Sequence, residues 1–289
     1  MSPADTLISL FEEHRDHLRG VAYRMLGSLD EADDALQQVW LRASRADLDH
    51  VSNLVGWLTT VTGRECLDML RARRGRKESP LHLASDVPPT ANAPEEETLL
   101  ADSVGLALLV VLDRLSPSQR VAFVLHDLFA VPFDEIAVIL ERSTTATKKL
   151  ASRARQSIHG AKPIDPVNQA RRTQLVRAFL AASRNGDIAT LLELLAPEVI
   201  RTADTIAVRG ATSSTVHGSH AVADETRTFT ARAEAAEVAL IDGAPGIIVA
   251  PRGRLFAVLD IDFNDHDQII TINVTADPHQ LDTIALALA

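Results

Sequence analysis

Residues 132–155 read PFDEIAVILERSTTATKKLASRAR, a pattern that predicts two helices joined by a turn. Apolar residues at helical spacing after Pro132 predict a short helix over Phe133–Leu140. Glu141-Arg-Ser143 predicts a turn, and Thr144–His159 predicts a second, basic helix. A short helix, a tight turn and a basic second helix are typical of a helix-turn-helix motif, whose second helix enters the major groove of DNA.

The charge of the chain at first argues against a nucleic-acid partner, because 289 residues carry a formal net charge of −10. That charge is unevenly distributed, since residues 163–289 hold 10 basic and 16 acidic side chains. Arg142–Lys162 contains 6 basic and no acidic residues, a local +6, and Arg64–Lys77 is locally +4. These two clusters predict surfaces that contact phosphates, while the acidity belongs largely to the C-terminal part.

The composition is that of a globular protein, with 46% hydrophobic and 24% charged residues. A single cysteine, Cys66, excludes an intramolecular disulfide framework and a zinc site built from several cysteines, and we expect no metal or cofactor. The longest apolar run, Val104–Leu112, is about half as long as a membrane crossing needs. The N-terminus does not resemble a secretory signal, so we expect a cytoplasmic protein with no membrane partner.

Composition shifts divide the chain into three predicted domains. Helical periodicity and a Ser28–Glu31 capping box predict an all-α domain over residues 1–79, and a linker rich in proline and glutamate follows over 80–98. The helix-turn-helix domain takes residues 99–162 and a short linker 163–168. Residues 169–289 begin with helices and continue with alternating strands. The predicted fold class is therefore multidomain, with two all-α domains followed by an α+β domain that has a curved antiparallel sheet.

Several motifs in a fixed order resemble the extracytoplasmic-function (ECF) sigma factors of the sigma-70 family. These motifs are DEADDALQQVWLR at 30–42, GWLTTV at 56–61, CLDMLR at 66–71, RVAFVLHDLF at 120–129, VPFDEIA at 131–137 and LASRAR at 150–155. The C-terminal part is similar to the SnoaL-like polyketide cyclase domain that one subgroup of these sigma factors carries. The segments that resemble it are 179–187, 191–196 and 277–278.

The resemblance implies a protein that is not an enzyme, and that binds core RNA polymerase and directs it to promoter DNA. Residues 1–79 would correspond to sigma region 2, which binds core polymerase and the melted minus-10 element, and 99–162 to region 4, which binds the minus-35 duplex. Polymerase contacts would come from Asp33, Asp34, Gln37, Gln38 and Arg42. Minus-10 contacts would come from His50, Ser52, Asn53, Arg64, Arg71, Arg73 and Arg74. Minus-35 contacts would come from Arg142, Thr144, Thr145, Thr147, Lys148, Lys149 and Arg153.

For the C-terminal domain the resemblance implies a cone-shaped, regulatory and non-catalytic unit that contacts the sigma domains. Its acidity suggests autoinhibition by electrostatic attraction to the basic DNA-binding surfaces. The relatives' Asp-Gly-Gly-Gly-Lys segment is absent near Arg201–Ile206, and their Asn-Pro-Asp-Lys-Leu segment is altered at 276–281.

Two alternative functions remain open from the residues. One is a helix-turn-helix transcription regulator with a ligand-sensing C-terminal domain. The other is a catalytic, isomerase-like or cyclase-like domain carried on a DNA-binding arm, for which acid–base residues would be needed in one cavity. The candidates for that role by residue type are Asp204, His217, His220, Asp260 and Asp262.

Overall fold

The computed structural model describes residues 3–48, 51, 53–77, 105–161, 163–208, 213–226 and 229–289. The chain divides into two compact units. The first unit comprises Met1–Val87 and Leu112–Gln156, and the second comprises Pro88–Val111 and Ser157–Ala289. Two stretches that lie far apart in the sequence therefore contribute to each unit.

The N-terminal helices of the first unit begin and end where the sequence supplies the right capping groups. They are α1 (Pro3–Glu13), α2 (Arg15–Leu26), α3 (Leu29–Ala43) and α4 (Leu54–Lys77). Gly27 ends α2 in the left-handed conformation at φ 74°, and the Ser28 hydroxyl then accepts a hydrogen bond from the Glu31 N–H at the start of α3. Leu18, Tyr23 and Leu58 are fully buried between these helices.

The helix-turn-helix prediction is confirmed to the residue. The helices in this part of the chain are α6 (Leu106–Arg114), α7 (Pro117–Phe123), the π-helical turn η1 (Val124–Leu128), α8 (Phe133–Leu140) and α9 (Thr144–His159). Glu141 closes α8 in the left-handed conformation at φ 54° and starts the turn to α9. Ser143 then caps α9, because its hydroxyl accepts a hydrogen bond from the Ala146 N–H at 3.2 Å.

The C-terminal part is an α+β domain, as predicted. Its helices are α10 (Pro166–Asn185), α11 (Ile188–Leu194), α12 (Ser219–Thr226), α13 (Thr230–Glu234), the 3-10 turn η3 (Pro251–Gly253) and α14 (Pro278–Leu281). Its strands are β1 (Leu195–Ala203), β2 (Thr215–His217), β3 (Ala236–Ile241), β4 (Ala244–Val249), β5 (Ala257–Phe263), β6 (Ile269–Thr275) and β7 (Leu286–Leu288).

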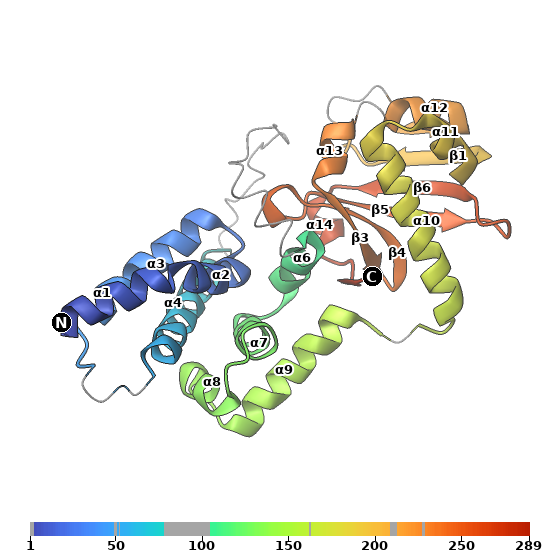
Figure 1. Cartoon of the computed structure of the whole chain (residues 1–289). Helices are drawn as coiled ribbons and strands as arrows, with labels where there is room; N and C mark the ends of the chain where they lie inside the picture. The colour runs from blue at the N-terminus through green and yellow to red at the C-terminus, as the bar shows by residue number, and fades with distance from the viewer. Residues whose placement is uncertain are drawn as a thin grey trace. The chain divides into compact units, whose positions relative to one another are not determined.

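The strands form one sheet in the order β2-β1-β6-β5-β4-β3-β7. The prediction of a wholly antiparallel sheet is corrected at one place, because β1 and β6 are paired in parallel. A long connection through α12, α13 and the β3–β5 meander joins these two strands, and a parallel pair needs such a crossover. Helix α10 lies across the sheet (Figure 1), and side chains of α10, α11 and α12 form the core with the face of the sheet that they cover.

Candidate nucleic-acid interface

The start of α9 presents a cationic, hydrogen-bonding surface to solvent. The predicted minus-35 residues that are exposed there are Arg142, Thr144, Thr145, Lys148, Lys149 and Arg153. On the opposite side of the helix Ala151 and Ala154 are fully buried in the supporting domain. This arrangement leaves the N-terminal turns of α9 free to enter a major groove, where Arg and Lys can pair with guanine and Thr can contact the thymine methyl.

Thr147 is a correction to the predicted minus-35 set. It is fully buried, and its hydroxyl donates a hydrogen bond to the Ser143 carbonyl at 3.1 Å. Positions 147, 151 and 154 follow the helical period and so share the inward face of α9. Thr147 therefore packs inside the domain, and the same periodicity that predicted the helix could have shown this.

The predicted minus-10 residues are placed only in part. His50 and Ser52 lie outside the described residues. Asn53 caps α4, because its side-chain oxygen accepts a hydrogen bond from the Gly56 N–H at 3.0 Å. Arg71 and Arg74 are exposed on α4, and Arg71 lies 3.9 Å from the Asp68 carboxylate. These two arginines keep the exposure that contact with a phosphate backbone requires.

Arg73 is engaged within its own domain. Its guanidinium donates to the Leu26 carbonyl at 3.2 Å and forms an ion pair with Glu31. The side chain is only 26% exposed, and it ties α4 to the junction between α2 and α3. The prediction that Arg73 contacts phosphate is therefore not supported by this arrangement.

The predicted polymerase-binding face lies along α3. Asp34, Gln37 and Gln38 are exposed there. Asp33 instead accepts two hydrogen bonds of 2.8 Å from Arg19, and Arg42 pairs with Glu65 at 2.6 Å. The exposed acid and amides remain available to set register at a polar protein interface.

A contact between the N-terminal helices and the helix-turn-helix domain is the feature that sequence reasoning missed. Helix α4 packs on α7 and α8, and a Cβ placed on Gly63 would lie 2.9 Å from a methyl carbon of Leu125. Beside this contact the Arg64 guanidinium lies 3.4 Å from the carboxylate of Glu141, in the turn before α9. A predicted minus-10 residue is thus paired with the helix-turn-helix domain.

A buried arginine reinforces this contact. Arg120 on α7 donates to the Met25 carbonyl at 2.8 Å and to the Asp113 carboxylate at 2.8 Å. Burial lowers the pKa of this guanidinium, and the Asp113 charge opposes that shift. A charge that is removed from water needs such partners, so Arg120 fixes the geometry of the contact. Its partner on α2 is a backbone carbonyl, which no sequence pattern marks.

The predicted acid–base candidates of the C-terminal domain are not brought together. His217 and His220 are exposed, and none of the five candidates lines the apolar cavity that has Phe179, Val222 and Phe256 in its wall. On β5 the residues Leu259 and Ile261 face the cavity or core, so Asp260 and Asp262 point to the other side of the sheet. Within the described part of the chain, His, Cys, Asp and Glu residues form no group suited to a metal ion.

Asp204 has a structural role. Its carboxylate accepts hydrogen bonds from the N–H groups of Ala207, Ala276 and Asp277 at 2.7, 2.6 and 2.8 Å. Desolvation acts to raise the pKa of Asp204, but these backbone donors outweigh it and hold the pKa below its ordinary value. Asp204 therefore links the turn that follows β1 to the segment Ala276-Asp277 that follows β6.

Comparison with known proteins finds the same two helical regions. The family model for sigma-70 region 2 matches residues 10–76, and that for sigma-70 region 4 matches residues 105–158. The probable ECF RNA polymerase sigma factor SigI of Mycobacterium tuberculosis is 36% identical over 203 residues, which is 69% of this chain and 70% of SigI. The ECF RNA polymerase sigma factor SigJ of the same species is 39% identical over 210 residues, 68% of this chain and 64% of SigJ.

Two solved structures are also similar. The crystal structure of M. tuberculosis SigJ aligns over 95% of this chain and 98% of its own, with 31% identity and a TM-score of 0.46. A snoal-like protein of unknown function from Burkholderia thailandensis aligns over 38% of this chain and 97% of its own, with 18% identity and a TM-score of 0.30. Among the described helices, none is both long and apolar enough to cross a membrane.

Proposed function

The chain belongs to the ECF sigma factors of the sigma-70 family. We propose which of its regions bind polymerase and promoter DNA, and which contacts restrain those regions before binding. As a member of this family it is a transcription-initiation factor rather than an enzyme, and its partners are core RNA polymerase and promoter DNA. It would work in the cytoplasm, where polymerase transcribes. The exposed residues of α3 would bind polymerase, and the exposed start of α9 would bind the minus-35 duplex. The melted minus-10 strand would be bound by Asn53, Arg64, Arg71 and Arg74.

The contact between α4 and α8 cannot persist on a promoter. Elements centred at −10 and −35 lie about 25 base pairs apart, which is roughly 85 Å of duplex at 3.4 Å per step. Arg64 and Glu141 are 3.4 Å apart, so the surfaces assigned to the two elements are adjacent in this structure. The first unit must open before both elements are bound, and this single observation carries the proposal.

The chain has enough length between its two sigma regions for that opening. Residues 78–104 separate the end of α4 from Gly105, and 27 residues reach roughly 90 Å when fully extended. That reach is close to the separation of the two promoter elements. The closed first unit is therefore proposed as the resting state, and the opened one as the state that engages polymerase and DNA.

The C-terminal domain is proposed to restrain region 4 through the first turn of α6. The Glu237 carboxylate on β3 accepts a hydrogen bond from the Ala107 N–H at 2.6 Å, and Leu109 packs on Gly253. Ala107 and Leu109 belong to the part of the chain that matches the region 4 model. This restraint acts at one helix terminus. It differs from the autoinhibition expected from the sequence, in which the acidic C-terminal domain is attracted electrostatically to the basic DNA-binding surfaces.

Trapping the closed unit tests the proposal. In the double variant R64C/E141C a short bismaleimide reagent would join α4 to the turn before α9. Cys66 does not compete, because it is fully buried and burial raises the pKa of its thiol. We expect the cross-linked protein to lose the transcription with core polymerase that the same double variant supports before cross-linking, while the reagent leaves each single variant at its own untreated level. Full transcription by the cross-linked protein would contradict the proposal.

A further inference from the structure

The C-terminal domain contains a partly open, apolar cavity of about 140 Å³ between α10, α12, α13 and the covered face of the sheet. Its walls include Phe179, Leu180, Val222, Ile247 and Phe256. An apolar cavity of roughly 150 Å³ in another protein stays dry and binds benzene, so this volume suits a molecule built on one small ring or a short branched chain.

Most polar side chains in the wall already have partners in the protein. The Ser183 hydroxyl donates to the Phe179 carbonyl at 2.7 Å, and the Thr226 hydroxyl donates to the Val222 carbonyl at 2.8 Å. Both are bonds to the preceding turn of their own helix. These hydroxyl protons are therefore not offered to a molecule in the cavity.

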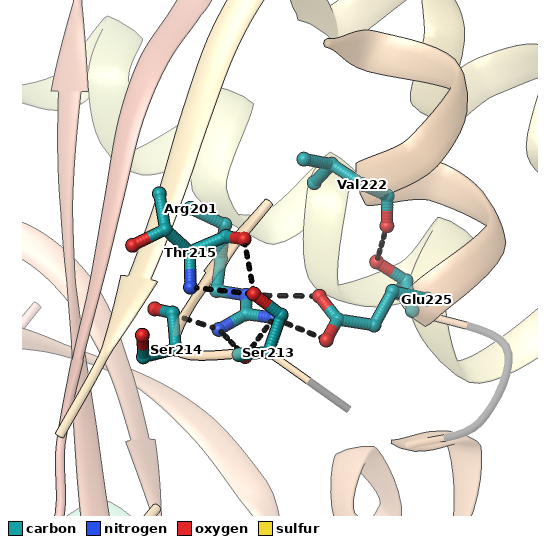
Figure 2. A network of polar contacts seen from close by, with 7 residues as sticks. Arg201, Ser213, Ser214, Thr215, Val222 and Glu225 are labelled. Carbon is teal, nitrogen blue, oxygen red and sulfur yellow. Dashed lines mark hydrogen bonds and ion pairs between the residues drawn. The ribbon is translucent and has the colours of Figure 1, made fainter. Parts of the chain in front are cut away.

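The charged pair in the wall is also satisfied. Figure 2 shows the Arg201 guanidinium held by the Glu225 carboxylate and by the carbonyls of Ser213 and Ser214. Arg201 is 7% exposed, and its contact from Nε to Glu225 is 2.8 Å. A buried pair with this many bonds closes one side of the cavity and leaves no uncompensated charge there.

Arg232 is different, because its guanidinium faces aromatic rings. It lies 4.9 Å from the ring centre of Phe229 and 6.0 Å from that of Phe256, and all three residues line the cavity. Burial lowers the pKa of Arg232. Within the described ranges it forms no ion pair with a carboxylate. A partly desolvated guanidinium with no carboxylate partner among the described residues can form charge-assisted hydrogen bonds with an anionic group of a ligand.

We propose that this cavity binds a compact apolar acid, with its hydrocarbon body against the apolar wall and its carboxylate on Arg232. Benzoate has the size and charge of such a ligand, and benzyl alcohol is a neutral molecule of similar shape. The proposal concerns binding alone and does not depend on how the C-terminal domain acts on transcription.

Binding of the two probes to the full chain by titration calorimetry tests the proposal. We expect benzoate to bind about tenfold more tightly than benzyl alcohol, since a charge-assisted hydrogen bond contributes at least that much. In R232Q the preference should vanish while benzyl alcohol still binds, which also shows that the cavity is intact. R232K should keep a preference for benzoate. R254Q removes the same charge from an exposed position outside the cavity and should leave both affinities unchanged.

Several results would overturn the proposal. The first is that the wild-type chain binds neither probe, and the second is that it binds benzyl alcohol more tightly than benzoate. The third is that R232Q and R254Q lose benzoate affinity equally. If circular dichroism shows that R232Q is unfolded, the benzoate and benzyl alcohol affinities of R232K and R254Q test the proposal instead. In that case the proposal requires R232K to bind benzoate more tightly than benzyl alcohol, and failure to do so contradicts it.

Discussion

The carboxylate of Glu237 accepts a 2.6 Å hydrogen bond from the backbone N–H of Ala107, which joins strand β3 to the first turn of α6. The first N–H groups of a helix lack partners within the helix, and a negative charge there is favoured by the helix dipole. One side chain of the C-terminal domain therefore supplies to region 4 a cap that its own sequence, with Gly105 before the helix, does not provide.

Replacement of Glu237 by Gln should release this restraint. A hydrogen bond to a charged group contributes about 1.5–3 kcal/mol, and the amide retains only part of it. We expect faster amide hydrogen exchange over residues 105–111 and a several-fold rise in transcription with core polymerase. E234Q removes the same charge from the exposed end of α13 and is the matched control. Unchanged exchange and transcription in E237Q would contradict the proposed restraint.

Alanine substitutions of Lys149 and Thr147, both on α9, should distinguish a loss of DNA contact from a loss of folding stability. Lys149→Ala should weaken binding to minus-35 duplex and reduce the slope of log affinity against log salt by about 1, because one phosphate contact is lost. Thr147→Ala should lower the free energy of unfolding and leave that slope unchanged, since Thr147 is buried. Fluorescence anisotropy over a salt series and urea denaturation measure the two effects. A changed slope for Thr147→Ala would contradict its assignment to the interior.

Gly63 controls how closely α4 approaches the helix-turn-helix domain. In Gly63→Leu the new side chain would collide with Leu125, so the closed first unit should be disfavoured and the radius of gyration in solution scattering should rise. Gly75→Leu is the control on the same helix, because a Cβ there meets no atom within 4 Å. An equal radius of gyration for the two variants would argue against a closed resting state.

Asp204 should make the stability of the C-terminal domain sensitive to acid. Its folded pKa lies below the unfolded value near 3.8, so its contribution is present above the unfolded pKa and is lost as pH falls through the folded pKa. Asp204→Asn should cost about 2 kcal/mol at neutral pH and less in acid, where the wild-type carboxylate is itself protonated. Asp262→Asn, at an exposed position on β5, should cost little at either pH. Denaturant unfolding at the two pH values measures both, and a cost for Asp204→Asn that does not change with pH would exclude this role.

Local patterns predicted the elements well and the long-range partners poorly. The bounds of α8 and α9 and the cap at Ser28 follow from spacing within a few residues, which the sequence displays directly. Arg73 pairs with Glu31, which is 42 residues away in the sequence, and Arg64 pairs with Glu141, which is 77 residues away. An arginine in a basic run looks the same in the sequence whether it faces phosphate or a distant carboxylate. Cavity residues such as Arg232 were missed for the same reason, because tertiary packing alone places them beside Phe229 and Phe256.

Transcription of a randomised promoter library by core polymerase, with and without this chain, shows whether the chain directs polymerase to promoters. We expect the chain to be required for specific transcripts. Their templates should be enriched in two unlike sequence blocks centred about 25 base pairs apart, roughly 85 Å along the duplex. Transcripts that do not depend on the chain, or enrichment of a single symmetric site that the chain binds without polymerase, would contradict the account and favour an ordinary helix-turn-helix regulator.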